Sequence, residues 1–185
     1  MTSNNNEKQG SCLITRRSFL FQSGAAVGST VMLTNLPGME GKAVAAQLAG
    51  YPKKKIGRLS ALKAGKPVRF RYPDKGRNSN SQLIKLGTRA GGGIGPDENV
   101  VAFNSFCTHQ GGPLVGQFQG DKGIAGPCPL HWTTFDLNRH GMVISGHATQ
   151  GLPQITLELE GDDIVATGVM GLIFSYGDNK ENPTV

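Results

Sequence analysis

Two short segments of the sequence each bring a cysteine and a histidine close together. The first, CTHQG, contains Cys107 and His109, and the second, CPLHW, contains Cys128 and His131. These residues are two of the three cysteines and two of the four histidines in the 185-residue chain. Thiolate and imidazole groups are preferred ligands of transition metals in proteins. The two segments therefore predict a metal centre that is built from two loops.

Three kinds of site could use these four side chains. A disulfide between Cys107 and Cys128 would leave the neighbouring histidines unexplained. A zinc ion would take all four as one tetrahedral site, but zinc modules usually group cysteine with cysteine and histidine with histidine along the chain. Here each segment supplies one of each, which favours a binuclear centre reached by both loops. In a Rieske [2Fe–2S] centre, two histidines replace two cysteines on one iron.

The segments CTHQG and CPLHW resemble the two cluster-binding loops of Rieske proteins in their order and in their Gly-Pro-rich setting. This resemblance implies one [2Fe-2S] cluster as the cofactor. It also implies that Cys107 and Cys128 hold one iron and that His109 and His131 hold the other.

Most of the remaining chain is similar to the small Rieske subunit of arsenite oxidase, as in YPKKKIGRLSALKAGKPVRFRYPD, AGGGIGPDENVVAFNSFCTH and GVMGLIFSYGDN. That resemblance implies a large molybdopterin-containing partner that oxidises arsenite. Electrons would pass from this partner to the cluster and then to a soluble acceptor such as a cytochrome c. The chain would thus be the electron-transfer subunit of an oxidoreductase, with no substrate chemistry of its own.

The loops depart from those of respiratory bc-type Rieske proteins. Many of those proteins carry a further cysteine in each loop, where this chain has Gly112 and Leu130, so the disulfide between the loops cannot form. They also place hydroxyl side chains after the second histidine, where this chain keeps Thr133 but has Phe135. Fewer hydrogen bonds to sulfur lower a potential, so we expect one below the top of the range of about −150 to +300 mV. A quinol-oxidising bc-type subunit and a non-redox zinc module remain alternatives.

The N-terminal segment resembles a twin-arginine export signal. Arg16 and Arg17 precede SFLF and a modestly apolar stretch, and Ala43–Ala45 provides small residues for cleavage. We expect residues 1–46 to form a leader and residues 47–185 to form the Rieske domain, located in the periplasm. Polar residues make the apolar stretch weak as a membrane span, so membrane attachment is expected only if the leader is retained.

The segments that position the two loops are predicted to be short β-strands. The composition, with 27 Gly, 10 Pro and 6% aromatic residues, is typical of a loop-rich all-β protein. We expect an antiparallel β-sandwich or barrel of the Rieske type, in which the cluster loops form a small inserted subdomain, about 105–140. Apolar segments between turn signals predict strands at 68–72, 82–86, 100–104, 123–126, 134–137, 142–145, 154–160, 164–167 and 172–175. The one helix expected outside the leader spans 56–64.

The charge pattern excludes a nucleic-acid partner. The net charge is +6, but the one dense basic run is Lys53–Lys55, and no basic patch is interleaved with aromatic residues. We expect Lys53–Lys55 to be a solvated face. Beyond the second ligand segment, Rieske proteins often place a proline-containing loop over the cluster. Pro153 could serve in this way with His147 near the rim, a plain turn being the alternative, whereas His140 is expected on the surface.

Overall fold

The computed structural model describes residues 50–179, so the expected leader lies outside the described residues. The regular elements of this part are β-strands and two short 3-10 turns, which confirms the all-β prediction. The strands are β1 (Lys54–Arg58), β2 (Val68–Arg71), β3 (Asn80–Lys85), β4 (Val100–Asn104), β5 (Phe118–Gln119), β6 (Ile124–Ala125), β7 (Thr134–Asp136), β8 (Met142–Ser145), β9 (Gln154–Glu160) and β10 (Asp163–Met170). No helix within residues 50–179 is long and apolar enough to cross a membrane.

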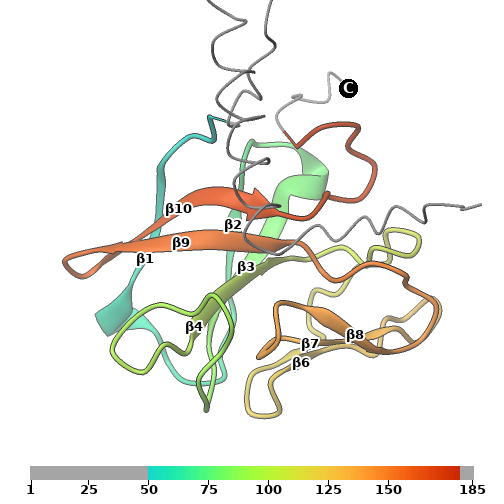
Figure 1. Ribbon diagram of the computed structural model, residues 1–185, viewed down its shortest axis with the longest axis horizontal. Helices are drawn as coiled ribbons and strands as arrows, with labels where there is room; N and C mark the ends of the chain where they lie inside the picture. The colour runs from blue at the N-terminus through green and yellow to red at the C-terminus, as the bar shows by residue number, and fades with distance from the viewer. Residues whose placement is uncertain (1–49, 180–185) are drawn as a thin grey trace, which may run out of the picture. The chain divides into compact units, whose positions relative to one another are not determined.

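The strands form two antiparallel sheets (Figure 1). The larger sheet has the order β1-β10-β9-β4-β3-β2, and the smaller has the order β5-β6-β7-β8. The outer strands of the larger sheet approach each other, because Lys54 on β1 donates a hydrogen bond to the carbonyl of Arg71 on β2 at 2.7 Å. The larger sheet is therefore curved towards a barrel, and the smaller sheet contains the segment between and after the two ligand loops.

The central strands β3 and β4 are buried on both faces and serve two separate cores. Leu83 and Ala102 face the inside of the curved sheet. Their neighbours Ile84 and Phe103 face outward into a second core, which also contains Cys107 and residues of the smaller sheet. Alternation along a strand sends successive side chains to opposite faces. The same two strands thus fill the barrel and carry the site.

Three predicted strands have the predicted bounds, namely 100–104, 142–145 and 154–160. In the last of these, Ile155 and Leu157 are buried, whereas Leu159 at the end of the hairpin is 39% exposed. Turn signals beside these apolar segments are sufficient to place them, although β4 is buried on both faces and β8 is mostly exposed.

Two element predictions were wrong. The helix expected at 56–64 is strand β1 followed by a single 3-10 turn, Leu59–Ala61, because the backbone of this segment pairs with β10. The strand expected at 172–175 is a turn: Ile173 accepts a hydrogen bond from the amide of Tyr176 and donates its own amide to the side chain of Asn179. In both segments tertiary hydrogen bonds outweigh weak local preferences.

Candidate metal centre

The first ligand loop is closed by two backbone hydrogen bonds. The amide of Gly111 donates to the carbonyl of Cys107 at 2.8 Å, and the amide of Cys107 donates to the carbonyl of Gly112 at 2.9 Å. Gly111 has φ = +66°, a left-handed conformation that glycine adopts without cost. This turn holds the Cys107 thiol inside the protein and turns His109 toward its rim.

The second loop repeats this pattern of hydrogen bonds. The amide of Trp132 donates to the carbonyl of Cys128 at 2.9 Å, and the amide of Cys128 donates to the carbonyl of Thr133 at 2.8 Å. Trp132 takes the position of the left-handed glycine, with φ = +64°. For a residue with a Cβ atom this conformation costs about 1–2 kcal/mol. The two loops thus have equivalent backbone hydrogen bonds. The histidine follows the cysteine by two residues in the first loop and by three in the second.

The two cysteines lie together in the core. Cys107 and Cys128 are buried and their thiols are free, so the structure does not contain the disulfide considered from the sequence. Burial raises the pKa of the Cys107 thiol, and the charge and hydrogen bond of Cys128 add to this effect. Hydrogen bonds from the backbone of His109 and from the Thr133 side chain act in the opposite direction. Two adjacent buried thiolates require a cation between them, as metal coordination provides.

The two histidines form a second pair. The ring centroids of His109 and His131 are 4.7 Å apart, with the rings at 79° to each other. Both side chains are half-buried. The Nδ1 atom of His109 is buried without a hydrogen-bond partner among the described residues. Because buried polar atoms are nearly always satisfied, this nitrogen indicates a ligand position.

The structure therefore places cysteine beside cysteine and histidine beside histidine, although the sequence alternates them. Within residues 50–179, no three His, Cys, Asp or Glu side chains converge as ligands of a single metal ion. A centre with two metal atoms, one beside each pair, fits all four residues.

Thr133 connects the thiols to the next segment of the chain. Its side chain is fully buried, and its Oγ1 accepts the amides of His147 at 3.2 Å and Ala148 at 3.4 Å. These two donors occupy the oxygen lone pairs, so the hydroxyl proton is available to the Cys107 sulfur. The hydroxyl that the sequence comparison placed near the cluster sulfurs is in the expected position.

The rim of the site contains a third imidazole. The exposed ring of His147 stacks on His109 with centroids 5.6 Å apart and lies 6.3 Å from His131. Its segment is tied to the first loop by a hydrogen bond from Thr108 to the carbonyl of Gln150 at 2.8 Å. His147 is therefore at the rim, as the sequence suggested, and no local sequence pattern distinguished this position from a plain turn.

Three further residues lie in or beside the segments that carry the site. Pro153 is buried directly before β9, where its carbonyl accepts the Asn104 amide at 2.9 Å. His140 is exposed, and its Nδ1 is 2.8 Å from the Gln154 side chain, as expected for a surface histidine. Trp132 is 73% exposed and is not a core residue.

Gly112 of the first loop faces Cys128 and Leu130 of the second. A Cβ atom at this position would be 2.5 Å from Cys128 Sγ and 3.2 Å from the Leu130 side chain. Gly112 and Leu130 are thus opposite each other, which is the arrangement that a disulfide between the loops would require. Glycine here gives the Cys128 sulfur room that any other side chain would occupy.

Comparisons with known proteins agree with this geometry. The family model of the Rieske [2Fe-2S] domain matches residues 53–156. The iodate reductase subunit IdrB of Denitromonas iodatirespirans is 56% identical over 167 residues, covering 90% of this chain and 87% of that protein. The corresponding subunit of Pseudomonas sp. (strain SCT) is 52% identical, over 88% of this chain and 83% of that protein.

Two further similarities are to a curated protein and to a solved structure of lower identity. The cytochrome bc1 complex Rieske iron-sulfur subunit of Streptomyces lividans is 32% identical, but over 45% of this chain and 44% of that protein. Among solved structures, the soluble domain of Rieske protein II (soxF) from Sulfolobus acidocaldarius superposes with a TM-score of 0.57 at 23% identity, covering 70% of this chain and 84% of that chain. The similarity to the Sulfolobus acidocaldarius structure supports the fold alone.

Proposed function

Because the chain belongs to the Rieske [2Fe-2S] family and carries one [2Fe-2S] cluster, we propose that it is the electron-transfer subunit of a larger oxidoreductase. In this proposal Cys107 and Cys128 hold one iron, and His109 and His131 hold the other. The observation that carries the assignment is the pairing of like side chains by two equivalent loops. The bound cluster supplies reversible one-electron transfer.

The protein residues supply the environment for that transfer. Burial excludes water from Cys107 and Cys128, and the Thr133 hydroxyl donates to the Cys107 sulfur. The half-buried rings of His109 and His131 lie nearer the surface and give a docked redox partner its shortest approach.

The sequence resembles the small subunit of arsenite oxidase, but two relatives above 50% identity are iodate reductase subunits. We therefore propose that this chain belongs to an iodate reductase, in which its two ligand loops would hold the cluster that supplies electrons to a large molybdopterin-containing catalytic subunit. Arsenite oxidation, with electrons flowing in the opposite direction, is the second candidate. In either case a soluble carrier such as a cytochrome c is the proposed external partner.

Purification of the tagged chain with its native partner tests this proposal. We expect a molybdenum-containing subunit to co-purify and a Rieske-type electron paramagnetic resonance signal to appear on reduction. Iodate should reoxidise the reduced cluster in the complex, whereas arsenite should not reduce the oxidised cluster. The reverse pair of results would select arsenite oxidation, and a chain that purifies alone without the signal would contradict the proposed function.

We also propose export by the twin-arginine route, on the basis of Arg16 and Arg17 ahead of SFLF. Changing both to lysine keeps the charge but removes the paired guanidinium groups that this signal requires. The doubly substituted precursor is expected to remain in the cytoplasm. Immunoblots of periplasmic and cytoplasmic fractions measure this. Unchanged periplasmic accumulation would rule out this route.

A further prediction concerns the reduction potential. Thr133→Val removes a hydrogen bond to the Cys107 sulfur, and such a bond stabilises the more negative reduced state by roughly 1 kcal/mol more than the oxidised state. The potential is expected to fall by about 40 mV, since about 59 mV corresponds to a tenfold change in a one-electron equilibrium. Protein-film voltammetry measures the change.

Thr133→Ser is the matched control, because it keeps the hydroxyl and should keep the potential near that of the native protein. If the valine and serine variants shift equally with intact cluster spectra, the effect comes from packing around residue 133 and not from the hydrogen bond.

A further inference from the structure

A strongly basic surface of the described chain lies around β2, beside strand β1, whose Lys54 donates a hydrogen bond to the Arg71 carbonyl. The segment 63–77 contains six basic side chains and one acidic side chain, Asp74, in a protein whose net charge is +6. All six basic side chains are exposed. They are Lys63, Lys66, Arg69, Arg71, Lys75 and Arg77, and we call them the β2 basic face.

None of these six cations forms an ion pair with a carboxylate in residues 50–179. Asp74 accepts hydrogen bonds from the Gly76 amide, the Ser79 hydroxyl and the Tyr176 hydroxyl, so it is already engaged. The β2 basic face therefore has a surplus of positive charge that the described part of the chain does not neutralise.

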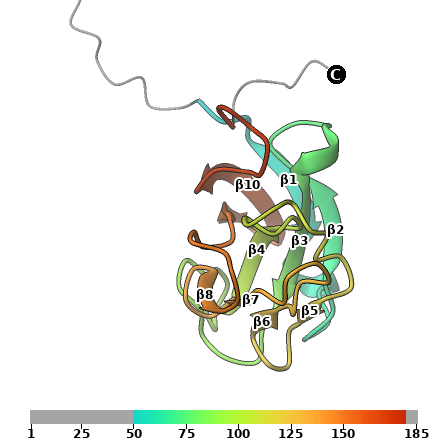
Figure 2. The same ribbon diagram turned by 90° about the vertical axis from the view of Figure 1, so that its right-hand side faces the viewer.

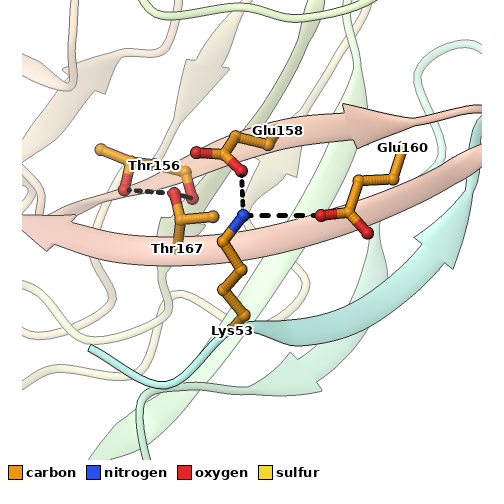
Figure 3. Close-up of polar contacts among 5 residues, drawn as sticks. All are labelled: Lys53, Thr156, Glu158, Glu160 and Thr167. Atoms are coloured by element: carbon orange, nitrogen blue, oxygen red, sulfur yellow. Dashed lines mark hydrogen bonds and ion pairs between the residues drawn. The ribbon is translucent and has the colours of Figure 1, made fainter. Parts of the chain in front are cut away.

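The run Lys53–Lys55 behaves differently. Lys53 lies 2.7 Å from Glu158 and 3.5 Å from Glu160 on β9, and Figure 3 shows these contacts. Lys55 lies 2.5 Å from Asp163. Lys53 and Lys55 are thus exposed cations paired with acids of β9 and β10, as expected of a solvated surface, whereas Lys54 is half-buried and donates to the Arg71 carbonyl.

The β2 basic face contains a hollow suited to carboxylates. Arg69 and Arg71 stand on the same side of β2, and with Phe70 and Asn80 they line a depression of about 300 Å³. The carbonyl of Asn80 accepts the amide of Ser105 at 2.8 Å, two residues before Cys107. Figure 2 shows β2 along the outer edge of the larger sheet. The hollow is thus on the part of the barrel that leads into the first ligand loop.

We propose that the β2 basic face docks an acidic surface segment of the catalytic subunit, with carboxylates seated between Arg69 and Arg71. The planar guanidinium group binds carboxylates through two parallel hydrogen bonds. A membrane would require apolar side chains beside the cations, and Val68 is the one large exposed hydrophobic residue of the segment. The identity of the partner rests on the proposed function, but the surface assignment rests on charge and geometry alone.

The test uses two double variants with equal loss of charge. Arg69→Gln with Arg71→Gln removes two unpaired cations, and Lys53→Gln with Lys55→Gln removes two cations that are paired within the chain. Each is co-expressed with the catalytic subunit, and retention of that subunit on the tagged chain is followed as sodium chloride is raised. We expect the arginine variant to weaken the complex at least about tenfold and the lysine variant to change it far less. The cluster spectrum should be unchanged in both.

The possible outcomes separate the two proposals. A complex that survives equally in both variants would overturn the docking site and leave the electron-transfer function standing. Absence of a co-purifying molybdenum subunit with the native chain would overturn both. Vesicles of phosphatidylcholine and phosphatidylglycerol provide a third measurement. If they bind the native chain and not the arginine variant, while the complex is unaffected, the occupant is a lipid surface and the protein-docking proposal is wrong.

Discussion

Replacing His131 with serine is expected to abolish the electron paramagnetic resonance signal of the [2Fe-2S] cluster while both sheets stay folded. The ring of His131 lies 4.7 Å from His109 and belongs to a loop that closes through its own backbone hydrogen bonds. Serine lacks the imidazole nitrogen that binds iron in a Rieske centre, and its side chain is too short to reach the same position. The larger sheet and its inner core do not contain the loop, so the far-ultraviolet circular dichroism should be retained.

His140→Ser is the control for this experiment. His140 is exposed and contacts Gln154 instead of the paired imidazoles, so its loss should leave the cluster signal intact. An unaltered signal in the His131 variant would show that this residue is not a ligand and would overturn the site assignment.

Gly112→Ala is expected to reduce the cluster content roughly tenfold or more. The added methyl group would be 2.5 Å from Cys128 Sγ, a distance that requires the sulfur or one of the loops to move. A free thiol could turn away at little cost, but a sulfur bound to iron is fixed by the other ligands. Overpacking of this kind costs about 1–3 kcal/mol, and 1.4 kcal/mol is a tenfold change in an equilibrium. Iron analysis and visible absorption of the purified variant measure the loss.

The control for Gly112 is Gly87→Ala. Gly87 is exposed, and an added Cβ there meets nothing within 4 Å, so the cluster content should equal that of the native chain. A full complement of iron in the Gly112 variant would mean that the loops stand further apart in the holoprotein than they do here.

The fold could be predicted wherever one local signal determined the structure. Strands such as 100–104 and 154–160 lie between strong turn signals and carry the right residue types. Strand β1 was missed because IGRLSALKA has a helical pattern of apolar residues, while its pairing with the distant β10 decides its conformation. Such pairing depends on residues more than a hundred positions away and has no local sequence signature.

The site could be predicted as a set of residue types but not as an arrangement. The sequence alternates cysteine and histidine, and only the folding of the loops places like beside like. The same holds for charge. Lys53–Lys55 is the dense basic run of the sequence, but acids of β9 and β10 neutralise Lys53 and Lys55. The scattered cations of residues 63–77 have no such acidic partners among the described residues.

The closure of the two ligand loops has a consequence for how tightly the cluster can be held. Each loop is fixed by a pair of main-chain hydrogen bonds that involve no metal. The conformational entropy of these loops is therefore lost when the polypeptide folds, at a cost of about 1–2 kcal/mol for each residue ordered. A receptor that is already rigid spends less of its binding free energy on ordering itself. Preorganisation of this kind favours retention of the cluster without a disulfide between the two loops.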